Sequence, residues 1–318
     1  MKHTSPQPIP IRGLSHVVGS SKTARASRPA RVQGGLGAPP SDGPSGDIRV
    51  LLKICRSPSP IPGSPSQTEM DSNWWDPMNF LQDQPTPQCL LRVKKDIAEF
   101  NAQPPARLFI SPEESDVTQV HVLMLGAPGS PYEGGFFQFF VKFPPNYPLS
   151  PPRVRFLNTD AGRVRFHIHL YNCGKVCVTT LGTAGTASDW SPAQSLSSTL
   201  VSIQSLLSDK PYFDALRQEK NPGDSDRYNT FVQYETIRVA VCDQVDAALR
   251  EDAKCPPAFR KIILESFLEW YSKYEDAVKY ETLLTRLQTL KEKVQKKKEE
   301  EEAAAAEAAA VAAENEVE

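Results

Sequence analysis

The sequence predicts an α/β (α+β) fold, in which an antiparallel strand meander follows one helix and precedes several others. Apolar residues recur near helical spacing in residues 88–100 and 195–207. They alternate in residues 120–124 and 137–143, and proline-rich turns separate the alternating segments. We therefore expect a strand meander with an N-terminal helix and C-terminal helices.

The composition indicates one globular core with long polar ends in a chain of 318 residues. Residues 1–80 are rich in Pro, Gly and Ser and are predicted to be a disordered tail. Residues 85–215 form the predicted core, and residues 216–280 form a helical extension of it. Residues 281–318 are predicted to be a charged, Ala-rich helical tail.

Two features stand out in the N-terminal tail. Residues 1–41 carry Arg and Lys but no Asp or Glu, a composition that overlaps organellar transit peptides. Because Pro6, Pro8 and Pro10 interrupt any helix there, a disordered basic tail is favoured.

Just before the core lies an aromatic cluster of Trp74, Trp75, Met78, Phe80 and Leu81. Packing of this cluster on the core is favoured over binding to a partner.

The core begins with a basic amphipathic helix predicted from Gln88 to Phe100, which Pro104–Pro105 ends. A turn at residues 129–135 joins the two alternating strands. Prolines between residues 144 and 152 then precede another strand, at residues 153–157.

The C-terminal part is predicted to be helical, over residues 195–207, 226–250 and 259–280. From residue 281 to 318 one long, weakly packed helix is expected. Its apolar stripe is narrow and consists of Leu283, Leu287, Leu290 and Val294. Lysines at 296–298 precede glutamates at i+4, which is the weaker orientation. A solvated helix is favoured, and a short coiled-coil contact is the alternative.

Charge and composition exclude several function classes. A net charge of −2 argues against nucleic acid or an anionic membrane as the main partner. No apolar run approaches the roughly 20 residues of a membrane helix, so a soluble protein is expected. Six cysteines at irregular spacing argue against a disulfide framework and favour a reducing compartment, the cytoplasm or nucleus.

Cys177 is the candidate reactive thiol. It ends the segment Tyr171–Cys177, which contains a glycine, and is followed by Trp190–Ala193. A sulfur that carries an acyl group must lie where two proteins can reach it. A glycine-containing turn before the sulfur and an anchored loop after it fit that requirement.

These segments resemble the catalytic core of the ubiquitin-conjugating enzymes. The matching blocks occur in order: Arg92–Ile97, Pro104–Pro105, Gly126, Ser130–Phe136, Phe143–Pro148, Pro151–Val154, Gly174–Cys177 and Trp190–Ala193. After the core, residues 221–225, 235–243 and 266–269 resemble the C-terminal extension of the Z-type branch of this family. That branch also has a longer loop between its cysteine and its Trp-Ser-Pro-Ala. The combination of blocks is specific.

The resemblance implies the UBC fold, with a four-stranded antiparallel sheet, an N-terminal helix and C-terminal helices. It also implies two exchanges at one sulfur. An activating enzyme transfers ubiquitin or a ubiquitin-like protein to Cys177 as a thioester. A lysine amine of a protein substrate then attacks the thioester carbonyl, usually with a ubiquitin ligase. A thiolate suits both steps because it is a good nucleophile and a good leaving group. No bound cofactor or metal is implied, since ATP is used by the activating enzyme.

The chain departs from the family eight residues before the cysteine. Family members usually have His-Pro-Asn there, whereas this chain has His167-Ile168-His169. The family's asparagine is credited with stabilising the oxyanion or holding the active-site loop, so His169 takes its position. An imidazole N–H could donate to an oxyanion, and losing such a donor typically costs about 10²–10³ in rate. Since the unperturbed pKa of His is about 6.5, His169 would add a pH dependence.

Two alternatives remain open. With His169 in place of asparagine, the domain could bind ubiquitin or a ligase without catalysing isopeptide formation. His167, His169, Cys173 and Cys177 could instead bind zinc. All four would then come from one short loop, unlike the separated ligand pairs of zinc fingers.

The resemblance also implies further site residues. Asp214 matches an acidic position near the incoming lysine, where it could orient or deprotonate the amine; a solvated loop carboxylate is the alternative. Trp190 is expected to anchor its loop in the core. The surfaces for the activating enzyme and ligases comprise Arg92, Lys94, Lys95, Leu149, Ser191, Pro192 and Ala193.

Overall fold

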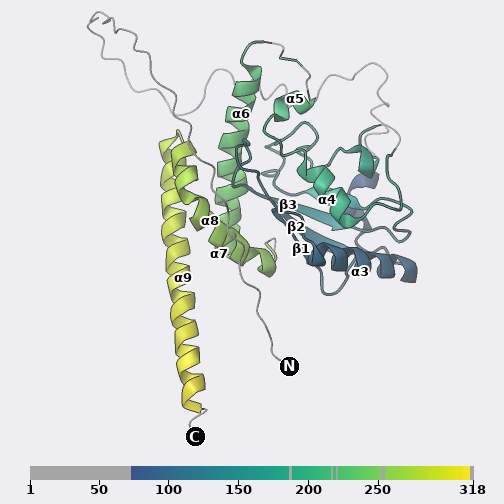
Figure 1. Cartoon of the computed structure of the whole chain (residues 1–318). Helices are drawn as coiled ribbons and strands as arrows, with labels where there is room; N and C mark the ends of the chain where they lie inside the picture. Colours follow the sequence, from purple (N-terminus) through teal and green to yellow (C-terminus); the bar gives the residue numbers. More distant parts are fainter. Residues whose placement is uncertain (1–72, 186–187, 216–217, 220, 252–254, 316–318) are drawn as a thin grey trace, which may run out of the picture. The chain divides into compact units, whose positions relative to one another are not determined.

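The computed structural model describes residues 73–185, 188–215, 218–219, 221–251 and 255–315, all within one compact unit, Gly46–Glu318. Helix α3 (Pro87–Ala102) precedes four strands (Figure 1). The strands are β1 (Leu108–Pro112), β2 (Gln119–Leu125), β3 (Phe136–Lys142) and β4 (Arg153–Phe156). Residues 1–72 of the expected disordered tail (1–80), including its basic part (1–41), lie outside the described residues.

The strands form one antiparallel sheet in the order β1-β2-β3-β4. Val122 pairs with Ile110 on one side and with Phe139 on the other, and Val141 pairs with Val154. The predicted four-stranded antiparallel fold is therefore confirmed. Strand β1 carries no clear alternation and ends in a proline, which an edge strand tolerates. For that reason the sequence pattern did not locate it.

Both faces of the sheet are covered, which explains why all seven residues of β3 are buried. Val122 and Phe139 point into the main core together with residues of helices α3 and α4. Leu123 and Phe136 point to the opposite face and join a second core with Phe259 and other residues of the C-terminal helices. The C-terminal extension therefore covers the second face of the sheet.

The helices after the sheet are α4 (Leu196–Gln204), α5 (Pro211–Ala215), α6 (Asp224–Glu235), α7 (Asp243–Leu249) and α8 (Pro257–Ala277). The π-helical segment η4 (Thr236–Cys242) joins α6 to α7, so the predicted helix over 226–250 is one helical stretch of changing pitch. The Gln138 amide on β3 donates to the Gln244 carbonyl oxygen on α7 at 2.7 Å. None of the described helices has the length and apolar character needed to span a bilayer.

The last helix, α9 (Glu281–Asn315), is packed along its first half. Its apolar stripe is buried, and the helix contacts α7, α8 and η4. Arg286 pairs with Asp243 at 2.8 Å and with Asp246 at 2.5 Å. This half differs from the solvated helix expected, because the stripe faces helices of its own chain. Residues 299–310 are exposed on all sides.

Residues 73–83, here called the N-terminal strap, lie against the edge strand β4. The strap contains the 3₁₀ turns η1 (Asn73–Trp75) and η2 (Pro77–Phe80). Trp75 is only 7% exposed, whereas Trp74 and Met78 are about half exposed. The aromatic cluster thus packs on the core through Trp75, as the favoured interpretation expected.

Candidate active site

The loop that carries Cys177 is folded against β4 by main-chain hydrogen bonds. Phe156 N–H donates to the Gly174 carbonyl at 2.8 Å, and Gly174 N–H donates to the Tyr171 carbonyl at 2.9 Å. Gly174 has a φ of +95°, and a β-carbon there would lie 2.8 Å from the Phe156 carbonyl oxygen. Only glycine fits this turn without displacing the strand. The chain then reaches Cys177 just before the 3₁₀ turn η3 (Thr179–Leu181).

The Cys177 side chain is half-buried, and its S–H points at the Thr183 carbonyl, 3.4 Å away. Burial raises the pKa of this thiol, while the positive charges of Lys175 and Arg165 and a hydrogen bond with Tyr171 act in the opposite direction. Among the other described cysteines, Cys173 is exposed, and Cys89, Cys242 and Cys255 are buried. Cys177 thus combines partial accessibility with neighbouring cations that favour a thiolate.

His169 lies beside Cys177 on the adjacent chain segment, because Cys177 N–H donates to the His169 carbonyl at 2.8 Å. The His169 imidazole is half-buried. Burial lowers its pKa, the positive charge of Arg165 lowers it further, and Asp214 raises it slightly. The imidazole is therefore neutral at neutral pH and retains one N–H to donate.

His167 is fully buried and contacts the main chain of His169. Its Nδ1 accepts the His169 main-chain N–H at 3.1 Å, which leaves the ring proton on Nε2. Nε2 is buried, finds no hydrogen-bond partner among the described residues and lies 3.9 Å from Asp214 Oδ2. Burial, followed by the charges of His169 and Arg165, lowers the pKa of His167 to about 3. This histidine is therefore neutral at neutral pH.

Asp214 lies on α5 and is about one-third exposed. Its Oδ2 accepts a hydrogen bond from the Ser208 hydroxyl, with 2.6 Å between the two oxygens. The structure brings this carboxylate to the histidine pair while leaving it open to solvent. It can therefore meet both an incoming amine and the imidazoles.

Arg165 was missed in the sequence, where it resembles a surface arginine of a short loop. It is 5% exposed and donates from Nε to the His167 carbonyl at 3.3 Å and from Nη2 to the Ile168 carbonyl. Its guanidinium lies 4.2 Å from the centre of the Tyr171 ring. Arg165 thus fixes the His167–His169 segment. The apolar residues on both sides of it, Val164 and Phe166, were the available signal of burial.

Thr183 was also missed. Its hydroxyl donates to the Val176 carbonyl at 2.6 Å and accepts the Val178 N–H at 3.0 Å. It therefore ties the chain after Cys177 back onto the chain before it. A threonine in a glycine-rich loop gives no sequence signal of such a role.

The zinc alternative requires His167, His169, Cys173 and Cys177 to converge. Over the described residues, no three His, Cys, Asp or Glu side chains are arranged to hold a metal ion. His167 Nδ1 already accepts a main-chain N–H. The geometry therefore favours a free thiol at Cys177.

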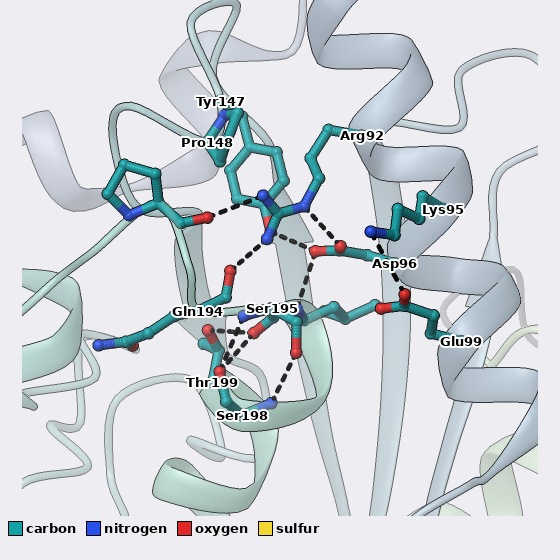
Figure 2. A network of polar contacts seen from close by, with 12 residues as sticks. Arg92, Lys95, Asp96, Glu99, Tyr147, Pro148, Gln194, Ser195, Ser198 and Thr199 are labelled. Carbon is teal, nitrogen blue, oxygen red and sulfur yellow. Dashed lines mark hydrogen bonds and ion pairs between the residues drawn. The ribbon is translucent and has the colours of Figure 1, made fainter.

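Arg92, expected on the surface for the activating enzyme, is instead bonded within the protein (Figure 2). Its guanidinium donates to Asp96 at 2.8 Å, to the Pro192 carbonyl at 2.8 Å and to the Gln194 carbonyl at 2.5 Å. Asp96 is 1% exposed and also accepts from the Tyr147 hydroxyl and the Leu196 N–H. Arg92 therefore joins α3 to the loop that precedes α4.

The other expected binding residues are exposed. Lys94 and Lys95 project from α3, and Lys95 lies 3.6 Å from Glu99. Leu149 is 73% exposed, and the exposed residues after Trp190 are Ser191, Pro192 and Ala193. Trp190 Nε1 donates to the Pro148 carbonyl at 2.8 Å. This bond joins the loop of Leu149 to that of Ser191–Ala193, so the two segments expected to contact ligases form one surface.

Comparison with known proteins identifies the same family. A family model described as ubiquitin-conjugating enzyme matches residues 92–234. Human ubiquitin-conjugating enzyme E2 Z is 40% identical over 267 residues, which cover 74% of each chain. The Xenopus tropicalis E2 Z is 40% identical over 252 residues, covering 71% of this chain and 79% of that protein. The Z-type likeness is thereby confirmed.

More distant similarities are shorter. The probable ubiquitin-conjugating enzyme protein 17 of Caenorhabditis elegans is 35% identical over 190 residues, which cover 56% of this chain and 25% of that one. A crystal structure of a ubiquitin conjugating enzyme E2 from Plasmodium falciparum matches 37% of this chain and 96% of its own, with 31% identity and a TM-score of 0.33. On the identity and coverage shared with E2 Z, the chain belongs to the ubiquitin-conjugating enzyme family.

Proposed function

We propose that Cys177 accepts ubiquitin or a ubiquitin-like protein as a thioester and passes it to lysine amines. The observation that carries this assignment is the setting of the Cys177 thiol. It is partly accessible, held by the Thr183 carbonyl at 3.4 Å, and lies near the cations Lys175 and Arg165. Family membership implies ubiquitin, an activating enzyme and ligases as partners in general, and the family binds no cofactor of its own.

In the first exchange, the Cys177 sulfur attacks the thioester carbonyl carbon that the activating enzyme presents. The new C–S bond forms as the bond to the activating enzyme's sulfur breaks, and that sulfur leaves as a thiolate. The Cys177 proton must be lost before attack. Lys175 and Arg165 stabilise the resulting thiolate against the cost of burial.

In the second exchange, a lysine amine attacks the carbonyl carbon held on Cys177. Negative charge develops on the carbonyl oxygen, and we assign the His169 imidazole N–H as the donor that stabilises it. Asp214 is assigned to orient the amine and accept its proton, since its carboxylate is exposed beside the histidine pair. The amide then forms as Cys177 leaves as a thiolate.

The partner surfaces follow the exposed residues. Lys94 and Lys95 on α3 are assigned to the activating enzyme. Leu149 and Ser191–Ala193 are assigned to ligase binding. Arg92 holds this surface in place by donating to the Pro192 carbonyl. The Z-type likeness favours a dedicated activating enzyme and a tandem ubiquitin-like modifier as second cargo. Protein substrates in the cytoplasm or nucleus are proposed, with neither nucleic acid nor membrane as a partner.

The test uses the full chain with ATP, ubiquitin or a tandem ubiquitin-like modifier, and a panel of activating enzymes. We expect an adduct that a thiol reductant removes, that is absent in Cys177→Ala and that persists in Cys173→Ala, the matched exposed cysteine four positions away. An adduct that forms on Cys177 but never reaches lysine would favour the binding-module alternative. Failure of every activating enzyme to charge the chain would refute the assignment.

A further inference from the structure

The N-terminal strap touches the active-site loop through one arginine of β4. Asp76 Oδ2 accepts from Arg155 Nη1, and the Arg155 guanidinium lies 5.9 Å from the centre of the Trp75 ring. Asp76 is 9% exposed, and its other oxygen accepts the Met78 N–H at 3.1 Å. One buried carboxylate therefore both caps the strap's second turn and holds Arg155.

Arg155 in turn lies directly over the turn that leads to Cys177. A β-carbon added at Gly174 would be 3.0 Å from Arg155 Cγ and 3.1 Å from Arg155 Nε, so the arginine side chain fills the space above this glycine. The main chains of Arg155 and Lys175 also form an antiparallel bridge. Arg155 thus fixes the position of Lys175, two residues before the thiol.

The strap also faces a cavity that the chain after Cys177 lines. Trp74 and Trp75 line a cavity of about 320 Å³ together with Leu181 and Thr183. Thr183 is the residue whose carbonyl receives the Cys177 S–H and whose hydroxyl bonds the Val176 carbonyl. The strap is therefore connected to the segment before the sulfur through Arg155 and shares a cavity with the segment after it.

A second arginine of β4, Arg153, also attaches the strap to the sheet. Arg153 stacks on Phe80 with its guanidinium 3.7 Å from the ring centre, donates to the Trp74 carbonyl at 3.2 Å and lies 3.7 Å from Asp83. None of these contacts involves the loop of Cys177. Asp83 therefore supplies a control position on the same strap.

We propose that Trp75 and Asp76 are positioning residues for the thioester reaction, acting through Arg155 on the Gly174–Lys175 turn. This proposal rests on the assignment of Cys177 as the thioester cysteine. Without the Asp76 charge, Arg155 loses its anchor and leaves Gly174 uncovered. The turn then loosens, and the sulfur is presented to the activating enzyme in more than one position.

The test compares Asp76→Asn with Asp83→Asn in single-turnover charging at saturating activating enzyme. The asparagine keeps an oxygen for the Met78 N–H, so the turn stays capped. We expect the maximal charging rate of Asp76→Asn to fall roughly tenfold, within the hundredfold that a 1 Å misplacement can cost. The activating-enzyme concentration that gives half-maximal rate should change little, and Asp83→Asn should charge as the wild type does.

Alkylation of Cys177 by iodoacetamide supplies a readout that needs no activating enzyme. A loosened turn exposes the sulfur, so Asp76→Asn should alkylate several-fold faster than the wild type while charging more slowly. A simple loss of folded protein would not raise alkylation at temperatures far below the unfolding midpoint. Unchanged charging and alkylation in Asp76→Asn, or equal losses in Asp83→Asn, would overturn the proposal. If the wild type itself forms no Cys177 adduct, the function assigned to Cys177 fails, and alkylation still reports on the strap.

Discussion

The main-chain N–H of Cys177 donates to the main-chain carbonyl of His169 at 2.8 Å. This bond places the thiol and the imidazole on neighbouring segments of one loop. The His169 N–H continues the chain of contacts to Nδ1 of the buried His167 at 3.1 Å. The two candidate catalytic residues are thus positioned by main-chain bonds that side-chain substitution at 169 leaves in place. Variants at His169 therefore test its imidazole rather than the loop.

His169→Ala should slow the discharge of Cys177 to free lysine. If the imidazole N–H stabilises the oxyanion, removing it costs about 10²–10³ in rate. Both exchanges pass through an intermediate with a negative carbonyl oxygen. In charging, the activating enzyme can supply its own hydrogen-bond donors to that oxygen, so the charging rate should change far less. Single-turnover discharge of purified thioester measures this effect. His169→Asn is the matched control and should restore discharge; a rate insensitive to His169→Ala would remove the role.

The pH dependence of discharge follows from the lowered pKa of His169. Burial and the Arg165 charge keep the imidazole neutral above its ordinary titration range of about 6.5. The ratio of wild-type to His169→Asn discharge rates should therefore stay constant from neutral pH upward and change only on the acid side. A ratio that changes between pH 7 and 8 would contradict the neutral imidazole.

The reaction of the free thiol should depend on pH at alkaline rather than acidic pH, because the pKa of Cys177 is raised whereas that of His169 is lowered. Burial raises the pKa of Cys177 above its ordinary value of about 8.5, because desolvation outweighs the nearby cations. Alkylation by iodoacetamide should thus still be rising about one pH unit above 8.5, where a thiol of ordinary pKa is almost fully ionised and its rate levels off. Peptide mass spectrometry after timed alkylation gives the rate at Cys177. A plateau near neutral pH would show that Lys175 and Arg165 dominate instead.

Arg92→Ala should destabilise the protein, unlike changes at the exposed lysines of α3. Arg92 donates to buried Asp96 and to two loop carbonyls, so its loss should lower the free energy of unfolding by about 2–3 kcal/mol. Lys94→Ala, on the same helix, should stay within about 0.5 kcal/mol of the wild type. Urea unfolding followed by circular dichroism measures both. Equal stabilities would mean that the Arg92 contacts are not maintained in solution.

The pair formed by the buried Lys142 and the partly exposed Asp116 should govern acid stability. Burial alone would raise the pKa of Asp116, but hydrogen bonds from Lys142 Nζ at 2.7 Å and from Thr118 outweigh it and lower the pKa well below its ordinary value. The stabilisation is therefore complete above the unfolded pKa of about 3.9 and is lost as pH falls through the lower folded pKa.

A substitution cycle isolates that pair. Asp116→Ala leaves the fully buried Lys142 ammonium without its counter-charge and should cost about 3 kcal/mol, the lower end for buried pairs because Asp116 is 22% exposed. Adding Lys142→Met should recover most of the loss. Unfolding free energies at pH 7 and pH 3 provide the comparison. If the single and double variants are equally unstable, charge burial is not the cause.

Much of the fold was predictable because local patterns and tertiary packing agree in it. The helix at Pro87–Ala102 follows an amphipathic pattern, and β2 begins with period-two alternation, whereas β3 is an apolar-rich segment buried on both faces. Strand β1 was not predicted from the pattern because a five-residue segment that ends in a proline is too short to show alternation. The packing of α9 was misjudged because a four-residue stripe cannot show whether the partner is solvent or the chain's own α7 and α8.

The candidate site was predictable where resemblance supplied it. His169 and Asp214 were named that way, whereas Cys177 already stood out by its glycine-containing segment. In the structure Asp214 lies 3.9 Å from His167, which accepts the His169 N–H, and the catalytic roles of these residues stay predictions. Sequence patterns could not show that Arg92 is bonded inward, since the acceptors Pro192 and Gln194 are about a hundred positions away. They also could not show that Asp76 reaches Arg155, a contact equally remote along the chain.

The central claim is that Cys177 carries the modifier, and replacement of its sulfur by oxygen tests it most directly. Cys177→Ser, incubated with ATP, modifier and activating enzyme, should form an oxyester adduct of one modifier mass that survives thiol reductant and is cleaved by hydroxide. The wild-type adduct should have the same mass and be cleaved by thiol reductant. Intact-mass spectrometry before and after each treatment gives the answer. A Cys177→Ser adduct that remains labile to thiol reductant would place the thioester on another cysteine and contradict the account.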